Sequence, residues 1–224
     1  MTGSVEAVVF DLDGTVVDTP DVITRTMCAV LTEMGAEVDP RDVRATIGKP
    51  LVASIASLLG LPDDDERVAA AASAYRERFG PQVTERGRRL LFPGVTDGLE
   101  TLRGSGIALA IATSKVLATA QLVLSATGIA GYFGVVVGHD DVPHGKPEPD
   151  MALLAARRLA VPPSKCLVVG DATGDMQMGV RAGMEVLGVS YGVADANDLL
   201  AAGARRVVDD FPAVVREVLV RAGG

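Results

Sequence analysis

The sequence lacks the features that mark secreted, disordered or membrane-spanning proteins. Only two of its 224 residues are cysteine, Cys28 and Cys166, and they lie far apart in apolar surroundings without the spacing of a metal site. We expect both to be reduced, buried thiols of a cytosolic protein. No tract has low complexity, and no apolar run approaches the roughly 20 residues needed to cross a bilayer. The sequence therefore predicts a globular protein without a membrane partner.

The N-terminal segment indicates the compartment in which we expect the protein, and the net charge limits the partners that we expect. Residues 1–4 are short and polar, and the apolar run after them ends at Asp11, so the sequence predicts no secretory leader and a cytoplasmic location. The formal net charge of −8 argues against nucleic acid or an anionic membrane as the main partner. If the substrate is a phosphate, a bound divalent metal and a few lysines must overcome this acidic balance locally.

Short apolar runs alternate with helical patterns along most of the chain, which is typical of a parallel sheet covered by helices. The runs are hydrophobic throughout, as in strands that are buried on both faces. This pattern predicts an α/β fold with a doubly wound parallel sheet. The expected strands are Val5–Phe10, Ile107–Ala112, Val135–Gly138, Cys166–Gly170 and Glu185–Val189. The expected helices include Val95–Arg103, Val116–Thr127, Met151–Leu159 and Met176–Ala182.

The alternation stops between the first and second expected strands. Residues 20–89 read as successive helices without a strand, and this segment is too long for an ordinary crossover between strands. We predict a small helical cap domain at residues 19–89, inserted into a core of residues 1–18 and 90–224. The alternative is a set of extra helices on the sheet with no separate cap. The expected helix breaks are Gly35, Asp39-Pro40, Gly48-Lys49-Pro50, residues 60–63 and Gly80-Pro81.

Polar residues follow several of the expected strands. In an open parallel sheet, ligands bind beyond the carboxyl ends of the strands, so these segments should converge on one crevice. Each alone has a structural explanation, because such acids and hydroxyls often cap helices and a single lysine usually lies at the surface. Their coincidence at one end of the sheet favours a common site. The segments are residues 11–15 (DLDGT), 113–115 (TSK), 144–150 (HGKPEPD) and 170–175 (GDATGD).

The residue types in this crevice suggest phosphoryl transfer. Asp11 and Asp171 would bring two carboxylates together, which is unfavourable unless a hard cation such as Mg²⁺ neutralises them. Asp11 could then attack phosphorus and form an aspartyl-phosphate. Asp13, two residues further on, could protonate the leaving oxygen and later activate water.

The remaining candidates would hold the phosphate and the rest of the substrate. Gly14 permits a tight turn that lets backbone N–H groups approach the phosphate. Thr113 or Ser114, together with Lys146, would bind the non-bridging oxygens. Lys49, in the turn at residues 47–51, either recognises a carboxylate or second phosphate of the substrate or is a solvated lysine. The predicted phosphate-binding or substrate-binding residues are Gly14, Thr15, Ser114 and Lys49.

The order and spacing of these motifs resemble the haloacid dehalogenase superfamily over essentially the whole chain. The matching segments are FDLDGTVVDT, IATSK, GKPEPD and the Gly170-Asp171-x-x-x-Asp175 motif. The resemblance implies a Rossmann-like core with a helical cap after the first strand. It also implies Mg²⁺ bound by the carboxylates of Asp11 and Asp171 and the backbone carbonyl of Asp13, with Asp175 behind them. The implied catalytic residues are Asp11 (nucleophile), Asp13 (acid and base), Thr113 and Lys146.

Within the superfamily, the segments GHDDVPHGKPEPD and GVSYGVADANDLLAAGARRVVDDF look most like the phosphoglycolate phosphatase and sugar-phosphate phosphatase branch. Ala172 departs from the family pattern, which often has serine or threonine there, so one hydrogen bond around the metal ligand is in doubt. The same loop sequence, with Pro147 after Lys146, predicts a cis Lys146–Pro147 peptide. The expected function is hydrolysis of phosphoglycolate, a sugar phosphate or a similar small metabolite.

Other functions on the same fold remain alternatives. Asp13 argues against a dehalogenase, because a halide needs no proton on departure. The Leu12-Asp13 pair and the lack of a clear cap lysine disfavour a phosphonatase. A phosphosugar mutase of the β-phosphoglucomutase type stays possible, although Gly170 stands where those mutases tend to have an acid. A catalytically silent binding module would not need the full set of reactive groups.

Overall fold

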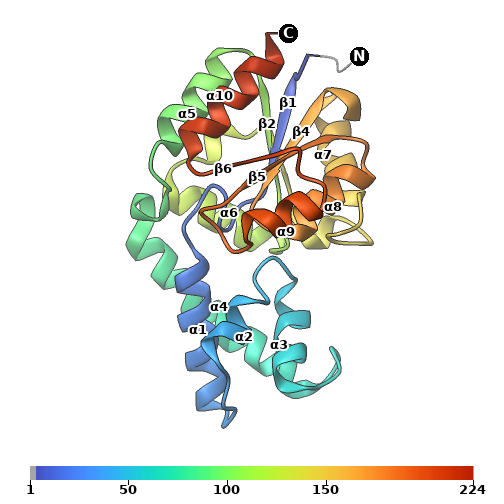
Figure 1. The fold of residues 1–224 in the computed structure, drawn as a ribbon. Coiled ribbons are helices and arrows are strands. Elements are labelled where there is room, and N and C mark those ends of the chain that lie inside the picture. The colour runs from blue at the N-terminus through green and yellow to red at the C-terminus, as the bar shows by residue number, and fades with distance from the viewer. Residues whose placement is uncertain (1–3, 224) are drawn as a thin grey trace.

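The computed structural model describes residues 4–223, so residues 1–3 of the segment used to predict the absence of a leader lie outside the described residues. The chain forms a parallel sheet of six strands in the order β3-β2-β1-β4-β5-β6, with helices on both faces (Figure 1). The prediction of an α/β fold with a doubly wound parallel sheet is confirmed. The strands are β1 (Ala7–Phe10), β2 (Ala108–Ala112), β3 (Val135–Val137), β4 (Cys166–Gly170), β5 (Glu185–Val189) and β6 (Arg206–Val208).

Ten α-helices and four short 3₁₀ helices connect the strands in the described part of the chain. Within residues 4–223, none of these helices combines the length and apolarity that a bilayer crossing requires. The α-helices are α1 (Pro20–Glu33), α2 (Pro40–Arg44), α3 (Leu51–Leu59), α4 (Glu66–Arg86), α5 (Val95–Gly104), α6 (Leu117–Thr127), α7 (Asp150–Leu159), α8 (Thr173–Arg181), α9 (Ala196–Ala201) and α10 (Phe211–Ala222). The 3₁₀ helices are η1 (Gly87–Leu90), η2 (Ala130–Tyr132), η3 (His139–Asp141) and η4 (Pro163–Lys165).

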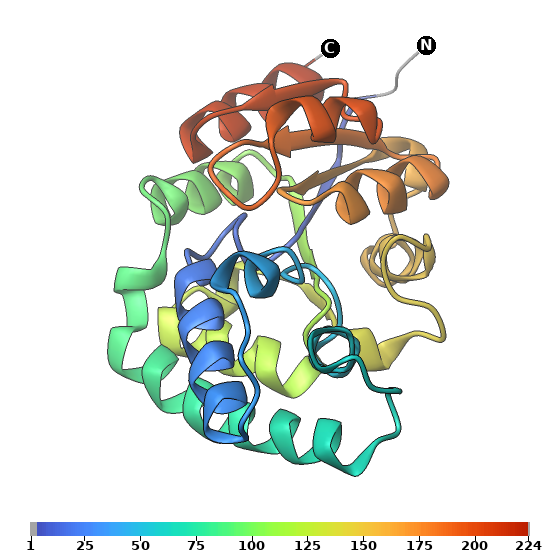
Figure 2. The ribbon, with the colours of Figure 1, turned by 60° about the horizontal axis from the view of Figure 1, so that its bottom comes forward.

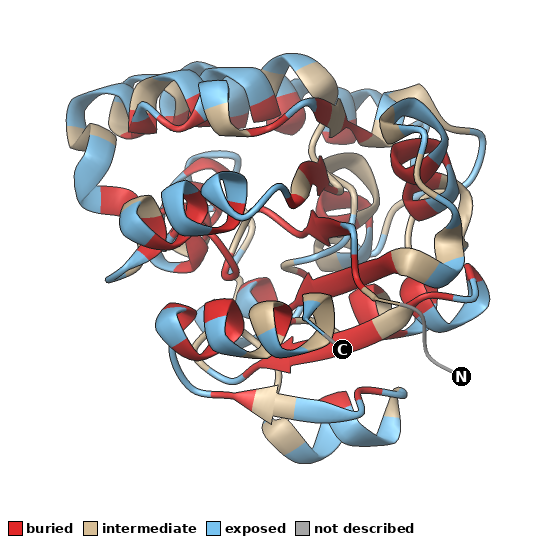
Figure 3. Cartoon of the chain, turned by 90° about the horizontal axis from the view of Figure 1, so that it is seen from above, coloured by how far each residue is buried: buried red, intermediate tan, exposed pale blue. Residues whose placement is uncertain are grey.

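The central strands are buried on both faces, which explains their continuous hydrophobicity. Successive side chains of a strand point to opposite faces. Val8 and Phe10 therefore join the cluster beneath α5, α6 and α10, whereas Ala7 and Val9 join the cluster beneath α7, α8 and α9. Figure 3 shows the sheet as a buried layer, with exposed residues on the outer sides of the helices. This packing fixes the carboxyl ends of β1, β2 and β4 at one edge.

Strand β6 was not predicted from the sequence. It has only three residues at the edge of the sheet, where it pairs with β5, and Arg206 in it is exposed. A short edge strand that is half solvated needs no continuous apolar run, so the pattern that marks the other five strands is absent. Helix α8 also begins earlier than predicted, because the Asp175 carboxylate accepts a hydrogen bond from the Ala172 N–H (3.0 Å) and stabilises the first turn.

Residues 20–90 hold successive helices, as predicted for residues 20–89, and α1–α4 lie together beyond the carboxyl edge of the sheet (Figures 1 and 2). The break predicted at Gly80-Pro81 is wrong, because α4 continues through Pro81 to Arg86. A proline inside a helix costs about 3 kcal/mol. Phe79 and Val83 on either side of it are 1% and 0% exposed, and their burial offsets that cost.

The two chain crossings between the core and α1–α4 run side by side. Val17 forms an antiparallel bridge with Leu91, and the Asp18 N–H donates to the Leu90 carbonyl oxygen (2.6 Å). The crossings therefore lie close to the positions predicted from the sequence. That residues 19–89 are a separate domain stays a prediction.

Candidate active site

The site begins where β1, β2 and β4 end. Phe10 pairs with Ile111 of β2 on one side and with Val169 of β4 on the other. The residues that follow the three strands therefore lie side by side at the carboxyl edge of the sheet. Asp11 continues the ladder by donating its N–H to the Val169 carbonyl oxygen (2.8 Å). The parallel register thus places Asp11 at the centre of the carboxyl edge.

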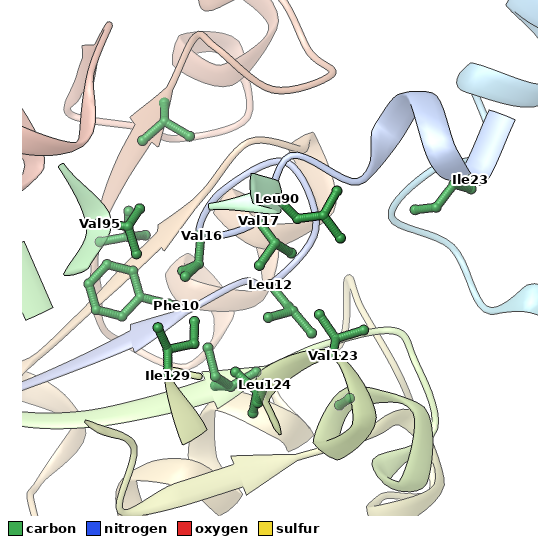
Figure 4. Close-up of a cluster of buried hydrophobic side chains, with 14 of the residues drawn as sticks. Phe10, Leu12, Val16, Val17, Ile23, Leu90, Val95, Val123, Leu124 and Ile129 are labelled. Carbon is green, nitrogen blue, oxygen red and sulfur yellow. The ribbon is translucent and has the colours of Figure 1, made fainter. Parts of the chain in front are cut away.

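The loop after β1 is anchored by apolar residues between its acids. Leu12, Val16 and Val17 are fully buried, and Figure 4 shows them turned into the cluster that also contains Val123. Asp11 and Asp13, which flank Leu12, instead line a cavity on the side of α1–α4. Burial of Leu12 therefore holds both acids at the cavity.

Gly14 is required in this loop for two reasons. Its φ of 82° lies in the left-handed region that favours glycine. A Cβ atom at this position would also lie 2.1 Å from Oδ2 of Asp171, which is far inside van der Waals contact. The absence of a side chain thus allows the loop after β1 to approach the acid after β4.

Three carboxylates form a buried cluster. One oxygen each of Asp11, Asp171 and Asp175 lie within 4.8 Å of one another, and the residues are 8%, 1% and 1% exposed. Lys146, from the loop before α7, is the cation in this cluster. Its Nζ contacts Oδ1 of Asp11 and lies 2.6 Å from Oδ1 of Asp175. The Lys146–Pro147 peptide is cis, as predicted.

The cluster holds more negative than positive charge, and the pKa values reflect this. Burial raises the pKa of Asp11 to about 7, with Asp175 and Asp13 adding to the rise and Lys146 opposing it. Burial and the charges of Asp11 and Asp175 raise the pKa of Asp171 well above its ordinary value. Burial alone would lower the pKa of Lys146, but the two adjacent carboxylates outweigh it and raise that pKa.

Asp171 has no cationic partner among the described residues. Its carboxylate instead accepts hydrogen bonds from the Thr15 hydroxyl (3.0 Å) and the Val193 N–H (2.9 Å). The Thr15 carbonyl oxygen in turn accepts from the Tyr191 hydroxyl (2.9 Å). Thr15 was predicted to bind phosphate, but it is fully buried and its hydroxyl donates a hydrogen bond to Asp171 instead.

These carboxylates suit a hard divalent cation. Magnesium prefers oxygen ligands and is commonly held by one or two carboxylates. Asp11 and Asp171 supply two such groups, whereas both oxygens of Asp175 are already engaged, one by Lys146 and one by the Ala172 N–H. An added positive charge would relieve the repulsion that raises the pKa of Asp171. The residues present therefore fit the predicted ion, with Asp175 behind the first two carboxylates.

Asp13 is held by two residues outside the predicted set. The Thr19 hydroxyl contacts Oδ1 of Asp13, and the Lys115 ammonium lies 3.1 Å from Oδ2. Lys115 also lies 4.5 Å above the ring centre of Phe79 in α4, an arrangement that is favourable for a cation. Lys115 thus contacts Asp13, the proposed acid, in the core and Phe79 in α4.

A cavity of about 640 Å³ separates the carboxyl edge from α1, α3 and α4. Asp11, Asp13, Thr113, Ser114 and Lys49 all line it. The cavity therefore brings together all the predicted residues except the buried group formed by Gly14, Thr15, Lys146, Asp171 and Asp175.

The turn at residues 47–51 reaches the core at this cavity. The Ser114 hydroxyl donates to the Gly48 carbonyl oxygen (2.6 Å), so Ser114 contacts the turn as well as lining the cavity. A Cβ atom on Gly48 would lie 3.3 Å from the Ala172 Cβ, and the small side chain of Ala172 leaves room for this approach. Lys49 is exposed at the edge of the cavity.

Sequence reasoning missed Thr19, Tyr75, Phe79 and Lys115. Thr19 and Lys115 were in the quoted motifs. Thr19 lies six residues after Asp13, which could have suggested it, whereas Lys115 reaches Asp13 only through the pairing of β1 and β2. Tyr75 and Phe79 belong to the buried face of an amphipathic helix, which does not distinguish them from ordinary core residues. His144, in contrast, is exposed, and its Nδ1 lies 3.3 Å from Oδ1 of Asp150.

Comparison with known proteins agrees with this geometry. The sequence matches the family described as haloacid dehalogenase-like hydrolase over residues 8–189. It is 44% identical over 209 residues to the "Probable phosphatase IndB" of Dickeya dadantii, covering 93% of this chain and 91% of that protein. It is 34% identical over 209 residues to the phosphoglycolate phosphatase of Salmonella typhimurium, covering 84% and 82%.

Among solved structures, a hydrolase from Pseudomonas syringae superimposes with a TM-score of 0.84 and 28% identity, covering 96% of this chain and 98% of that one. The family match spans the motifs at Asp11, Thr113, Lys146 and Asp171, which converge here on one site. This chain belongs to the haloacid dehalogenase-like hydrolase family.

Proposed function

We propose that this chain is a magnesium-dependent phosphatase that hydrolyses a small phosphorylated metabolite through an aspartyl-phosphate at Asp11. The observation that carries the proposal is the position of Asp11. It faces the cavity, contacts Lys146 and lies within a buried acidic cluster whose charge that one lysine does not balance. The similarity to proteins named as phosphatases supports the same activity.

The proposed reaction has two steps that use Asp11 and Asp13. An Asp11 carboxylate oxygen attacks phosphorus, the bond from phosphorus to the leaving oxygen breaks, and Asp13 gives that oxygen a proton. Asp13, now ionised, then takes a proton from water as the water oxygen attacks phosphorus. The bond between phosphorus and Asp11 breaks, which releases inorganic phosphate and restores both carboxyl groups.

Other residues would hold the reacting groups in place. The carboxylates of Asp11 and Asp171 and the backbone carbonyl of Asp13 would hold Mg²⁺. When bound, the ion would supply positive charge that neutralises the carboxylates and polarises the phosphoryl oxygens. Lys146 and Thr113 would bind phosphoryl oxygens, where negative charge develops in the transition state.

The substrate proposed from the sequence is phosphoglycolate or a sugar phosphate. Similarity to a phosphoglycolate phosphatase supports the first, and the size of the cavity admits the second. The cytoplasm stays the proposed compartment, since Cys28 and Cys166 are both free thiols. Cys166 is buried as predicted, whereas Cys28 is only half-buried.

The test is turnover of p-nitrophenyl phosphate under controlled metal conditions. Activity should vanish with a chelator and return with Mg²⁺, whereas Ca²⁺ should inhibit, because it prefers longer bonds and higher coordination numbers. Asp11→Asn should abolish turnover while keeping the thermal unfolding profile of a folded protein. Full activity in excess chelator would remove the metal from the mechanism, and near-normal turnover by Asp11→Asn would remove the covalent step.

A further inference from the structure

The cavity beside Asp11 contains a lysine to which the proposed reaction gives no role. Three lysines and arginines of residues 4–223 line this cavity. Lys49 and Arg76 are exposed, whereas the side chain of Lys115 is only 13% exposed. Within the described chain, Lys115 is therefore the mostly buried cation of the cavity wall.

Two contacts fix the position of the Lys115 ammonium. Its Nζ lies 3.1 Å from Oδ2 of Asp13 and 4.5 Å from the ring centre of Phe79 in α4. Among residues 4–223, Asp13 supplies the one carboxylate within ion-pair distance of this ammonium. An ammonium has three N–H donors, so Lys115 can bind Asp13 and still donate to a ligand in the cavity.

The position of Asp13 places this ammonium close to the leaving group of the substrate. In the proposed reaction Asp13 hydrogen-bonds the leaving oxygen. Such a hydrogen bond is about 3 Å long, so the Lys115 Nζ comes within about 6 Å of the leaving oxygen. In phosphoglycolate, the carbon that carries the leaving oxygen also carries a carboxylate, and this carboxylate can lie between the leaving oxygen and Lys115.

The apolar part of the cavity wall offers an anion no comparable partner. This part includes Ile23 and Met27 of α1, Leu51 of α3 and Leu122 of α6. A carboxylate that is removed from water and left against such side chains is strongly destabilised. Deep in the cavity, an anion on the leaving group is therefore favourable next to Lys115.

We propose that Lys115 binds an anionic group of the leaving alcohol and so selects phosphate monoesters that carry a carboxylate next to the leaving oxygen. The proposal rests on the phosphatase activity proposed above. Of the two substrates proposed there, it favours phosphoglycolate over the phosphate of an uncharged sugar. Lys115 is then a residue that determines specificity, and the chemistry remains with Asp11 and Asp13. Phe79 holds the ammonium at the cavity wall, because a cation over an aromatic ring is attracted to it.

Phosphoglycolate and 2-hydroxyethyl phosphate form a matched pair of substrates. Both are two-carbon esters of a primary alcohol, and they differ by a carboxylate in place of a hydroxymethyl group. With Mg²⁺, we expect kcat/KM for phosphoglycolate to exceed that for 2-hydroxyethyl phosphate by about tenfold or more, the usual effect of a hydrogen bond to a charged group. Equal or better turnover of 2-hydroxyethyl phosphate would overturn the proposal.

The variant Lys115→Met keeps an apolar side chain of similar length and removes the charge. It should reduce the preference for phosphoglycolate to near one, even if the loss of the contact with Asp13 lowers turnover of both esters. Lys115→Arg keeps the charge and should retain a preference. Lys165→Met is the matched control, because Lys165 pairs with Glu6 outside the cavity and should leave the preference unchanged.

Thermal unfolding shows whether each variant is folded, and Lys115→Gln gives the same comparison if Lys115→Met is not. A preference that survives in the folded variant without the charge would overturn the role of Lys115. Loss of the preference in Lys49→Met, with the preference kept in Lys115→Met, would assign the recognition to Lys49 and overturn it as well.

Turnover of p-nitrophenyl phosphate in the same assay separates the two proposals. If it is hydrolysed with Mg²⁺ while phosphoglycolate is not preferred, the phosphatase activity stands and the role of Lys115 is wrong. If no ester is hydrolysed, the phosphatase activity itself is wrong, and the role of Lys115 is rejected with it.

Discussion

Gly14 shows how one backbone position decides where a charged side chain lies. Its left-handed conformation turns the loop after β1, and its missing Cβ leaves room for the carboxylate of Asp171. Gly192 approaches the same carboxylate from the other side, and a Cβ there would also lie 2.1 Å from Oδ2. Two glycines therefore allow Asp171 to sit between backbone segments that would otherwise exclude it.

The variant Gly14→Ala should weaken metal binding. The new methyl group would collide with Asp171, and displaced supporting groups typically cost 10–100-fold in metal affinity. We expect the dissociation constant for Mg²⁺, measured by calorimetry, to rise by about tenfold or more. Gly104→Ala is the matched control, because a Cβ on Gly104 in α5 meets nothing within 4 Å. Unchanged Mg²⁺ affinity in a folded Gly14→Ala protein would argue against Asp171 as a ligand.

At the scale of secondary-structure elements, the two crossings explain how α1–α4 could move against the core. They are adjacent, joined by the bridge between Val17 and Leu91, and little other backbone pairing links the two parts. The Ser114–Gly48 hydrogen bond and the Lys115–Phe79 contact close the opposite side of the cavity. These side-chain contacts can break without disturbing the sheet, so we propose that residues 19–89 close over the substrate as a lid.

Closure can be measured by fluorescence energy transfer between dyes on introduced cysteines. Labels at the exposed positions Ser57 in α3 and Ala201 in α9, in a Cys28→Ser background, should show a narrower distance distribution when Mg²⁺ and orthovanadate are added. A pair within the core, Arg157 and Ala201, serves as the control and should not change. Identical distributions for the Ser57 pair with and without ligand would contradict a moving lid.

Much of this arrangement could be predicted from the sequence because it depends on local patterns. Buried strands such as Cys166–Gly170 are continuous apolar runs, and the acids after them stand out against that background. The edge strand β6 and the path of α4 through Pro81 could not be predicted, because tertiary packing decides both. For the same reason the role of the Thr15 hydroxyl, directed to Asp171, was not visible in its motif.

The residues of α4 that line the cavity could not be predicted from the sequence for a different reason. Tyr75 and Phe79 have the spacing of core residues, and only the tertiary placement of α4 brings them to the cavity that Asp11 and Thr113 also line. Lys115 was quoted in its motif without a role, since its position beside Asp13 depends on two strands meeting. Local patterns therefore predicted the core side of the site better than the side formed by residues 19–89.

At the scale of the whole molecule, the buried acids should make stability depend on pH and metal together. Asp11 has a folded-state pKa of about 7, and that of Asp171 is also raised, whereas unfolded aspartate titrates near 3.9. Between these values the folded state binds more protons than the unfolded state. The contribution of these two groups to the free energy of unfolding therefore falls as pH rises from about 4 to 7 in the absence of metal.

Thermal unfolding in chelator and in excess Mg²⁺, from pH 4.5 to 8, tests this linkage. Because the ion binds the ionised carboxylates, the rise in Tm that it causes should grow with pH across the window. The Asp65 carboxylate, whose pKa Arg67 lowers to about 2, titrates below this range and does not obscure the effect. A Tm increase that is absent, or equal at pH 5 and pH 8, would contradict the predicted cation site.

The most direct test of the account is to trap the phosphoenzyme. Rapid acid quenching during turnover of p-nitrophenyl phosphate with Mg²⁺, followed by peptide mass spectrometry, should find one added phosphoryl group on the peptide that contains Asp11. The same peptide should be unmodified in chelator and in Asp11→Asn. Steady release of phosphate with no modified peptide, or modification at another residue, would contradict covalent catalysis by Asp11.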